Sequence, residues 1–554
     1  MTDAPRADEL LFLPLGGTGE IGMNLNLYGH DGAWLMVDLG VMFADATRPG
    51  VDVLMPDPAF IEDRRENLVG LVLTHAHEDH IGAVGYLWPR LRCPIYATAF
   101  TAAMLQPKLM EAGIDDEVQV IEVPLSGRFT AGPFEVELIT LTHSIPEPNA
   151  LVIRTPAGTV LHTGDWKLDP APLVGESYDE KALRDLAKEK VLAMVCDSTN
   201  AMVEGESGSE AEVRAVLMEV VAGLRNRVAI ACFSSNVARV ETAAKVAEAT
   251  GRRVCLAGRS MLRVYQAARD TGYLGNLPPL VSEEDVGYLP RDEVLILCTG
   301  SQGEPRSALW RIANDENNRV VLQPDDTVIF SSRVIPGNDK AIYALQNKLA
   351  LKGVEVITAD DHEVHVSGHP AREELTRMYQ WVRPQIAVPV HGEARHLAEH
   401  ARLARACQVP QQIVATNGAL VRLAPGPAEI VDHVPSGYLA LDGARLMSLG
   451  SSVLRSRQHL AYNGAAAVTL VIGGDGLLQG QPMISAPGVL DEETEGDKLA
   501  VIVEGLTDAL RRLPAADRRD DEAVKEAARM AVRRGFSRML GKKPVTKVHV
   551  VRLH

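Results

Sequence analysis

The chain has 554 residues, of which 46% are hydrophobic and 23% are charged, as in ordinary globular proteins. This composition excludes collagen, disordered tails and coiled coils as the main architecture, and the length predicts about three or four domains. The 56 basic and 73 acidic side chains give a net charge of −17, which excludes a uniformly basic nucleic-acid-binding protein but not a local basic cleft.

The cysteines and the N-terminus indicate a reducing compartment. The six cysteines form no C-x-x-C pair, and Cys196 and Cys298 lie in apolar runs, as buried reduced thiols do. The first residues lack the apolar core of a signal peptide, and we find no run of about 18 uncharged apolar residues. We therefore expect a soluble, cytoplasmic protein that does not enter a membrane.

The first part of the chain, residues 1–208, predicts a mixed α/β domain. Apolar or alternating runs bounded by Gly, Pro or Asp occupy 10–15, 23–28, 34–37, 68–73, 134–141, 151–154 and 160–162. Helical segments lie between some of these predicted strands. This mixture favours sheet-on-sheet packing.

A second α/β domain is predicted over 209–360. Ser209 and Glu212 form a capping box that opens a helix to about Leu224. Predicted strands at 228–233, 254–256, 294–298 and 327–330 then alternate with helices at 236–249 and 261–271, as in a parallel sheet. A strand at 385–390 and a helix at 394–406 indicate that the chain returns to the first domain over 361–430.

The last part of the chain predicts a linker at 431–459 and a small domain over 460–554. Proline and glycine residues between 425 and 443 indicate the linker. The small domain shows strand-like runs at 465–472 and 481–484 and helices at 498–510 and 522–540. Residues 505–554 hold 13 basic and 6 acidic side chains, a net +7 that indicates a solvated helical face, with an RNA-facing or subunit-facing surface as the alternative.

The strongest chemical signal is the stretch Thr74-His75-Ala76-His77-Glu78-Asp79-His80, which lies between an apolar strand and a helical run. Three imidazoles and a carboxylate this close together are too many for core packing, and together they suit Zn²⁺ or Mn²⁺. Two metals need more ligands, including a bridging carboxylate. Three further side chains, each just past a strand-like run, complete a predicted binuclear site: His143, Asp165 and His391.

These motifs resemble the metallo-β-lactamase fold, in which Asp38 of Val37-Asp38-Leu39-Gly40 matches an aspartate that supports the metal ligands. Asp197, His369 and His391 match the three motifs of its β-CASP branch. The glycine-rich stretch 16–22, the stretch 299–305 and the chain length are similar to the bacterial ribonuclease J family. The resemblance covers nearly the whole chain.

The resemblance implies an α/β fold: a metallo-β-lactamase αββα sandwich with an inserted parallel-sheet β-CASP domain and a small α+β C-terminal domain. It implies two divalent ions, Zn²⁺ first, with Mn²⁺ or Mg²⁺ as alternatives. One ion would be held by His75, His77 and His143 and the other by Asp79, His80 and His391, with Asp165 bridging them. Hydroxide would attack the phosphodiester and leave 5′-phosphate products.

The resemblance also implies roles for groups beside the metals. Asp79 counts among the catalytic residues, and His369, oriented by Asp197, is the candidate proton donor to the leaving 3′-oxygen, with a metal-bound water as the rival. A clamp for the 5′-monophosphate of RNA is expected at His365, Val366, Ser367, Gly368 and His369.

Ser234 and Ser235 would close this clamp near the N-terminus of the next helix, where anions are favoured; capping that helix is their alternative role. A clamp one nucleotide from the metals would release mononucleotides in the 5′→3′ direction.

The leading expectation is therefore a metal-dependent ribonuclease with 5′→3′ exonuclease and endonuclease activity in mRNA decay and rRNA processing. Its substrate would be single-stranded RNA with a 5′-monophosphate. We expect a homodimer or homotetramer, with RNA-degradation or ribosome-associated complexes as further partners.

Three alternatives compete with this expectation. A β-CASP DNA nuclease typically has Val where His391 stands. A small-molecule hydrolase of the same fold needs no second domain for closure. An RNA-binding scaffold with an inactive site disagrees with the complete ligand set.

Three further patterns carry less weight. Gly17–Gly22 satisfies G-x-G-x-x-G, but the strand-like alternation after it favours a turn between strands over a dinucleotide site. His396 and His400 have helical spacing without the glutamate of H-E-x-x-H, so we expect surface histidines. The arginines of the inserted domain either line an RNA channel or are solvated: Arg252, Arg253, Arg259 and Arg263.

Overall fold

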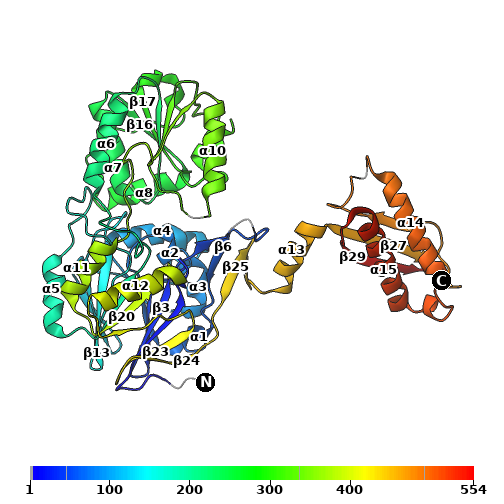
Figure 1. Cartoon of the computed structure of the whole chain (residues 1–554), viewed down its shortest axis with the longest axis horizontal. Coiled ribbons are helices and arrows are strands. Elements are labelled where there is room, and N and C mark those ends of the chain that lie inside the picture. The colour runs from blue at the N-terminus through cyan, green and yellow to red at the C-terminus, as the bar shows by residue number, and fades with distance from the viewer. Residues whose placement is uncertain (1–3, 45–46, 336, 492, 554) are drawn as a thin grey trace. The chain divides into compact units, whose positions relative to one another are not determined.

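The computed structural model describes residues 4–44, 47–335, 337–491 and 493–553. The chain forms two compact units, the first made of Met1–Met42 and Met55–Tyr438 and the second of Phe43–Leu54 and Leu439–His554. The elements are labelled in chain order in Figure 1. Among the described residues, we find no helix long and apolar enough to cross a membrane.

Two mixed sheets pack face to face in the first unit. The eight-stranded sheet has the order β24-β23-β1-β3-β4-β7-β8-β9, and the seven-stranded sheet has the order β10-β11-β12-β13-β14-β20-β22. The first comprises β1 (Leu10–Gly16), β3 (Leu25–His30), β4 (Ala33–Val37), β7 (Leu68–Val72), β8 (Ile95–Ala97), β9 (Val120–Glu122), β23 (Ala419–Ala424) and β24 (Glu429–His433). The second comprises β10 (Arg128–Ala131), β11 (Phe134–Thr140), β12 (Asn149–Thr155), β13 (Gly158–His162), β14 (Ala193–Asp197), β20 (Ile386–Val390) and β22 (Gln411–Gln412).

The core of this sandwich joins side chains of both sheets. Phe12 and Tyr28 of the first sheet and Leu151 and Val195 of the second are all fully buried in it. A second core covers the other face of the seven-stranded sheet with the helices α5 (Glu180–Leu186), α11 (Arg372–Val382) and α12 (Ala394–Ala406). The remaining helices of this half are α1 (Ala59–Glu62), α2 (Glu78–Ile81), α3 (Val84–Leu91) and α4 (Ala99–Ala112). The expected αββα sandwich is confirmed.

The inserted domain is a parallel five-stranded sheet of order β16-β17-β15-β18-β19. Its strands are β15 (Val228–Ala231), β16 (Arg253–Ala257), β17 (Val294–Cys298), β18 (Thr327–Phe330) and β19 (Glu355–Ile357). Its helices are α6 (Glu210–Ala222), α7 (Val237–Ala249), α8 (Arg259–Asp270), α9 (Ala308–Ala313) and α10 (Asp339–Leu351). The central strands are continuous apolar runs because crossover helices bury both faces of a parallel sheet. The capping box at Ser209 is present.

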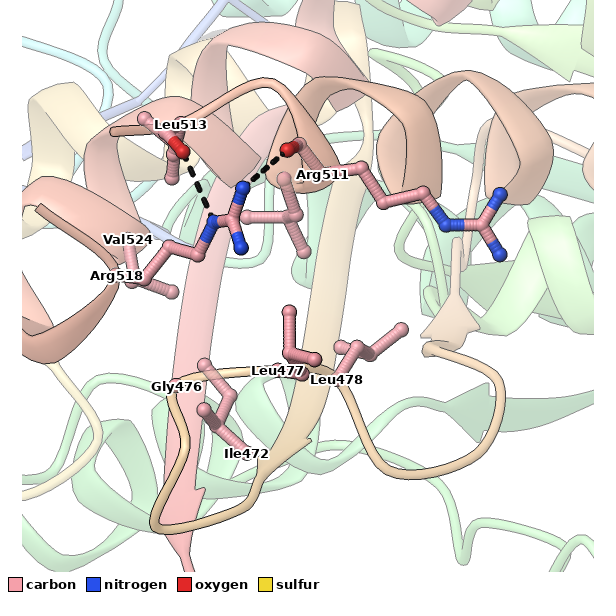
Figure 2. A pocket seen from close by; sticks show the side chains of 9 residues that line it. Ile472, Gly476, Leu477, Leu478, Arg511, Leu513, Arg518 and Val524 are labelled. Carbon is pink, nitrogen blue, oxygen red and sulfur yellow. Dashed lines mark hydrogen bonds between the residues drawn. The ribbon is translucent and has the colours of Figure 1, made fainter. Parts of the chain in front are cut away.

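The second unit has a three-stranded sheet, ordered β28-β27-β29, packed on two helices. These elements are β27 (Ala465–Ile472), β28 (Met483–Ser485), α14 (Gly496–Arg511), α15 (Asp521–Leu540) and β29 (Val545–Arg552). Leu470, Leu506 and Phe536 are fully buried between sheet and helices. A gap of about 20 Å³ is lined by Leu510 and Val524, and the Arg518 guanidinium beside it donates to the carbonyls of Arg511 and Leu513 (Figure 2).

The segment expected to be a linker, 431–459, is instead largely structured. It contains β25 (Tyr438–Asp442), β26 (Arg445–Ser448) and the start of α13 (Ser452–Asn463). Gly443, at φ +61°, turns β25 into β26, and Arg457 of α13 forms an ion pair with Asp442 at 2.6 Å. Glycine and proline are common in tight turns as well as in linkers. In this segment they lie in a hairpin turn and in loops between structured elements. The short strands β5 (Met42–Phe43) and β6 (Val53–Pro56) continue this sheet.

Candidate functional site

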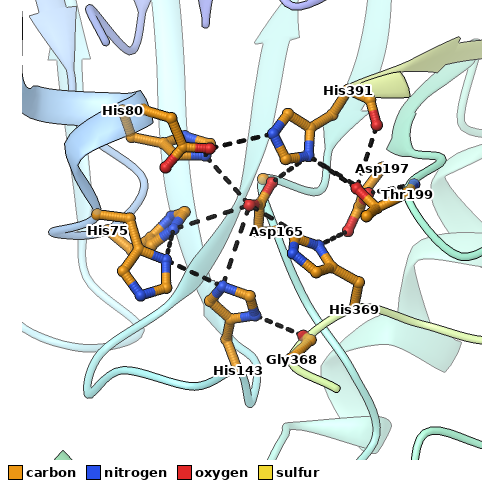
Figure 3. Close-up of polar contacts among 12 residues, drawn as sticks. His75, His80, His143, Asp165, Asp197, Thr199, Gly368, His369 and His391 are labelled. Carbon is orange, nitrogen blue, oxygen red and sulfur yellow. Dashed lines mark hydrogen bonds and ion pairs between the residues drawn. The ribbon is translucent and has the colours of Figure 1, made fainter. Parts of the chain in front are cut away.

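The seven expected metal ligands come together where loops leave the strands of both sheets (Figure 3). His75 and His77 lie between β7 and α2, whereas Asp79 and His80 lie in the short helix α2 itself. His143, Asp165 and His391 follow β11, β13 and β20. Each group thus stands just past the carboxyl end of a strand, as the sequence predicts.

Three imidazoles and one carboxylate form the first group. His77 Nδ1 lies 3.0 Å from His75 Nε2 and 3.1 Å from His143 Nε2. One nitrogen from each of these imidazoles and one carboxylate oxygen of Asp165 all lie within 4.8 Å of one another. Burial lowers the pKa of His77 to about 4 and holds the pKa values of His75 and His143 well below the ordinary range. Neutral imidazoles whose lone pairs converge fit a divalent cation.

The second group contains Asp79, His80, Asp165 and His391. Asp165 Oδ2 lies 3.2 Å from His80 Nε2, Asp165 Oδ1 lies 3.2 Å from His391 Nδ1, and Asp79 Oδ2 lies 3.2 Å from His391 Nε2. Burial opposes protonation of His80 and His391, but the surrounding carboxylates raise both pKa values well above the ordinary one. The carboxylates that favour a proton on these imidazoles would equally favour a cation beside them, so this group also fits a divalent metal.

Asp165 belongs to both groups. Its Oδ2 also lies 4.0 Å from His75 Nε2 and 4.0 Å from His143 Nε2. Its side chain is almost fully buried, at 3% exposure. One carboxylate between two sets of imidazoles has the placement of a bridging ligand.

Asp38 supports this cluster from behind. Its buried carboxylate accepts a hydrogen bond from His80 Nδ1 at 2.7 Å and one from the Thr74 backbone N–H at 2.8 Å. The bond to Nδ1 leaves His80 Nε2 facing the metal position, which is the usual purpose of such a partner. Gly40 allows the close packing needed here, because a Cβ at that position would lie 1.7 Å from the carbonyl oxygen of Asp79.

His143 is held by the return segment from the inserted domain. Its Nδ1 donates to the backbone carbonyl of Gly368, so Nε2 is left for the cluster. A Cβ on residue 368 would lie 2.7 Å from the His143 ring, so only glycine fits at this distance. The metal cluster and the segment 365–369 are therefore in direct contact.

His369 and Asp197 meet as expected. His369 Nδ1 donates to Asp197 Oδ2 at 2.8 Å and lies 3.8 Å from Asp165 Oδ2. Asp197 is fully buried, whereas the His369 side chain is 22% exposed. The pair therefore places one imidazole edge at the border between the cluster and solvent.

The expected clamp residues lie in the half-buried segment 365–369. Ser367 Oγ accepts a hydrogen bond from Asn200 Nδ2 at 2.7 Å, and burial lowers the pKa of His365 to about 3. Arg239 of α7 donates to the carbonyl of Val364 at 3.0 Å, so this helix lies against the start of the segment.

The side chain that caps α7 is Asn236, which accepts from Arg239 N at 2.9 Å. The alternative that Ser234 or Ser235 caps this helix is therefore wrong. Both serines are half-buried in the loop between β15 and α7.

Sequence analysis missed several groups that touch the site. Thr199 Oγ1 lies 3.1 Å from His391 Nδ1, and Asn24 Nδ2 lies 3.1 Å from His80 Nε2. Asn200 donates to Ser367 and to the His369 carbonyl. Thr199 and Asn200 lie two and three residues after Asp197, so their closeness to a motif aspartate was the available signal.

Two expectations about surface residues are wrong. His400 is fully buried, with Nδ1 2.8 Å from Ser198 Oγ and Nε2 2.8 Å from the Tyr379 hydroxyl, and His396 is 9% exposed. Both lie on α12, whose apolar face covers β20. Arg252 neither lines a channel nor faces solvent, because its guanidinium donates to the carbonyls of Leu224 and Asn226.

The glycine-rich stretch is a connection between strands, as expected. It joins β1 to β3, which pair in antiparallel fashion. Its short strand β2 (Thr18–Gly19) pairs with β21 (Gly392–Glu393), and the carbonyl of Gly17 accepts from the His391 N–H at 2.6 Å. The stretch therefore helps to fix His391.

Sequence profiles of known families match most of the chain. The metallo-β-lactamase superfamily matches 22–190, the ribonuclease J β-CASP domain 225–349, the Zn-dependent metallo-hydrolase RNA specificity domain 353–411 and the ribonuclease J C-terminal domain 452–553. A solved structure of a protein of unknown function from Enterococcus faecalis, 16% identical with a TM-score of 0.50, shares the fold over 75% of this chain and 100% of that one.

Three curated relatives match this chain over more than nine-tenths of their own length. Ribonuclease J of Sinorhizobium meliloti is 45% identical over 556 residues, which cover 100% of this chain and 99% of the relative. Ribonuclease J of Mycolicibacterium smegmatis is 38% identical, covering 97% and 96%, and that of Thermus thermophilus is 35% identical, covering 93% and 91%. The chain belongs to the ribonuclease J family of metal-dependent hydrolases.

Proposed function

We propose that this enzyme is a ribonuclease that degrades single-stranded RNA from a 5′-monophosphate in the 5′→3′ direction and also cuts internally. The observation that carries the proposal is the pair of ligand groups that share Asp165, with His369 and Asp197 at their border. Membership in the ribonuclease J family supports RNA as the substrate. In the cell it would act in mRNA decay and rRNA processing.

The described residues fit two divalent cations, with Zn²⁺ as the first candidate and Mn²⁺ or Mg²⁺ as alternatives. His75, His77 and His143 would hold one, Asp79, His80 and His391 the other, and Asp165 both. When bound, the ions would supply Lewis acidity at the phosphodiester and lower the pKa of water. Asp38 and Gly368 keep the imidazole nitrogens of His80 and His143 aimed at these positions.

His369 is the proposed proton donor to the leaving 3′-oxygen. Asp197 accepts the hydrogen bond from Nδ1, which leaves Nε2 as the nitrogen that carries and gives up a proton. This arrangement orients the ring and fixes its tautomer, as a carboxylate does for other catalytic histidines.

The 5′-phosphate clamp is proposed at residues 365–369 with Ser234 and Ser235. Backbone and side-chain donors of this segment, including Ser367 and the Gly368 amide, border the metal cluster through the contact between Gly368 and His143. The neighbouring N-terminus of α7 favours an anion. A phosphate held there would lie near the metals, which supports removal of single nucleotides from the 5′ end.

The test is degradation of one 5′-labelled single-stranded RNA by metal-loaded enzyme. The RNA carries a 5′-monophosphate or a 5′-triphosphate, with a matched DNA and the Asp79→Ala/His80→Ala variant as controls. We expect mononucleotides from the monophosphate RNA and no product from the variant. Internal cuts regardless of the 5′ end would refute the clamp, and no cleavage of any RNA would refute the nuclease.

A further inference from the structure

The loop that carries His143 ends at Glu147, a buried carboxylate where the sandwich meets the inserted domain. Glu147 is 7% exposed. Its Oε2 accepts a hydrogen bond from the Phe100 N–H in the first turn of α4 at 2.8 Å, and its Oε1 accepts one from the Tyr273 hydroxyl at 2.8 Å. Tyr273 follows α8 in the inserted domain, so one side chain joins three segments.

This contact is separate from the two places where the chain passes between the domains. The chain crosses after β14 and again before α11, whereas Glu147 and Tyr273 meet beside α4 and α8. The rings of Phe100 and Tyr273 also pack edge to face, with centroids 6.1 Å apart. The second polar link there, between Arg263 and Glu111, is more than half exposed on both sides and contributes little. The bond between Glu147 and Tyr273 is the buried polar link of this contact.

The same loop is fixed at both of its ends. His143 at its start donates to the carbonyl of Gly368, and Glu147 at its end accepts from Tyr273. Glu147 has φ +57°, a conformation that a residue with a side chain holds only when its surroundings impose it. Asn149, two residues on, donates its backbone N–H to the carbonyl of Thr74, which precedes His75. The contacts to Gly368 and Thr74 hold this loop against the cluster without Tyr273, and the bond from Tyr273 ties the held loop to the inserted domain.

We propose that Tyr273 is a positioning residue, whose hydrogen bond to Glu147 sets the inserted domain in register with the loop of His143. This inference rests on the proposed function, because register between the domains matters only for a substrate that contacts both. A polynucleotide would span the inserted domain and the metal cluster. A small phosphodiester would need the metal cluster alone.

The experiment compares wild type with Tyr273→Phe, which removes one hydroxyl and keeps the ring against Phe100. Tyr265→Phe is the matched control, because Tyr265 lies on α8 and its ring faces Arg269 rather than the sandwich. Each full-length, metal-loaded protein is assayed on a single-stranded RNA and on bis(p-nitrophenyl) phosphate. RNA affinity is measured separately in EDTA by fluorescence anisotropy, and the melting temperature is recorded.

For Tyr273→Phe we expect kcat/KM on RNA to fall about tenfold, the effect of one buried hydrogen bond to a charged group. Turnover of the small phosphodiester should stay within about twofold of wild type. The melting temperature should fall by no more than about 5 °C, as expected for one buried hydrogen bond. RNA affinity should weaken in EDTA, and Tyr265→Phe should match wild type in every assay.

Two results would overturn the inference. Equal losses on both substrates would show that the bond supports the metal loop alone, and unchanged RNA turnover would show that the bond sets no register. Failure of the proposed function is a different result, because the wild-type enzyme would then not cleave RNA at all.

Discussion

Arg239 is the buried cation whose removal should destabilise the inserted domain most. Its guanidinium is 0% exposed and donates to both carboxylate oxygens of Glu210, at 3.2 and 3.0 Å, and to the carbonyl of Val364 at 3.0 Å. Burial opposes ionisation of Glu210, but Arg239 holds its pKa below the ordinary value. In Arg239→Met the Glu210 carboxylate keeps a hydrogen bond from Asn236 at 3.1 Å but loses its buried countercharge.

Loss of one partner from a buried ion pair costs about 3–5 kcal/mol, because the other charge is left uncompensated. Chains with several domains do not follow two-state unfolding, so the loss of stability is best measured locally, by hydrogen exchange of peptides from α6 and α7. Protection there should fall by roughly 10²–10⁴-fold. Arg263→Met, which removes an exposed pair, should change protection less than about fivefold.

The double variant Arg239→Met/Glu210→Gln separates charge from packing. A neutral amide needs no countercharge, so most of the lost protection should return. If Arg239→Met exchanged like Arg263→Met, the Glu210 carboxylate would have to be hydrated in the folded protein, and the reasoning would fail.

Three further predictions concern the cluster and its surroundings. Asp165→Asn should reduce the metal content at both positions, measured by elemental analysis, and lower RNA turnover at least about 100-fold, measured by RNA cleavage. Loss of only one ion would contradict the role of Asp165 as a shared ligand. His369→Ala should lower turnover about 10²–10⁴-fold with unchanged metal content, and full activity would remove His369 as proton donor. Burial lowers the pKa of His400 to about 4, so its contribution to stability is complete above about pH 6.5 and falls by about 3 kcal/mol as the pH drops toward 4. As the pH is lowered from 7 to 4.5, the melting temperature should therefore fall less steeply for His400→Gln than for wild type. Equal slopes of melting temperature against pH would contradict this.

The sequence predicted those strands and helices whose pattern of apolar and polar residues is clear within a short segment of chain. The apolar run Val294–Cys298 reads as a buried parallel strand because crossover helices cover both of its faces, and it is one. The ligand cluster was equally visible, since imidazoles and carboxylates beside strand ends have few other uses. The assignment of distant ligands such as His75 and His391 to one site came from the resemblance to the family, not from their spacing.

Partners far apart in sequence could not be predicted. β29 alternates, with Lys547 and His549 on its outward face, as a half-buried strand does, and sequence analysis missed it. Its parallel pairing with the distant β27 has no local signal. His400 looked like a surface residue because its partners, Ser198 and Tyr379, come from other elements. The bond from Tyr273 to Glu147 spans 126 positions, and neither residue belongs to a motif.

The hydrogen bond from His143 to the carbonyl of Gly368 is invisible to ordinary mutagenesis. Every residue has a backbone carbonyl, so a substitution at 368 cannot delete the acceptor and reports only the collision of a new Cβ with the imidazole. What the bond does demand is a fixed chain length before residue 368. Insertions or deletions between β19 and Gly368 should therefore disable the metal cluster even though they alter none of its ligands.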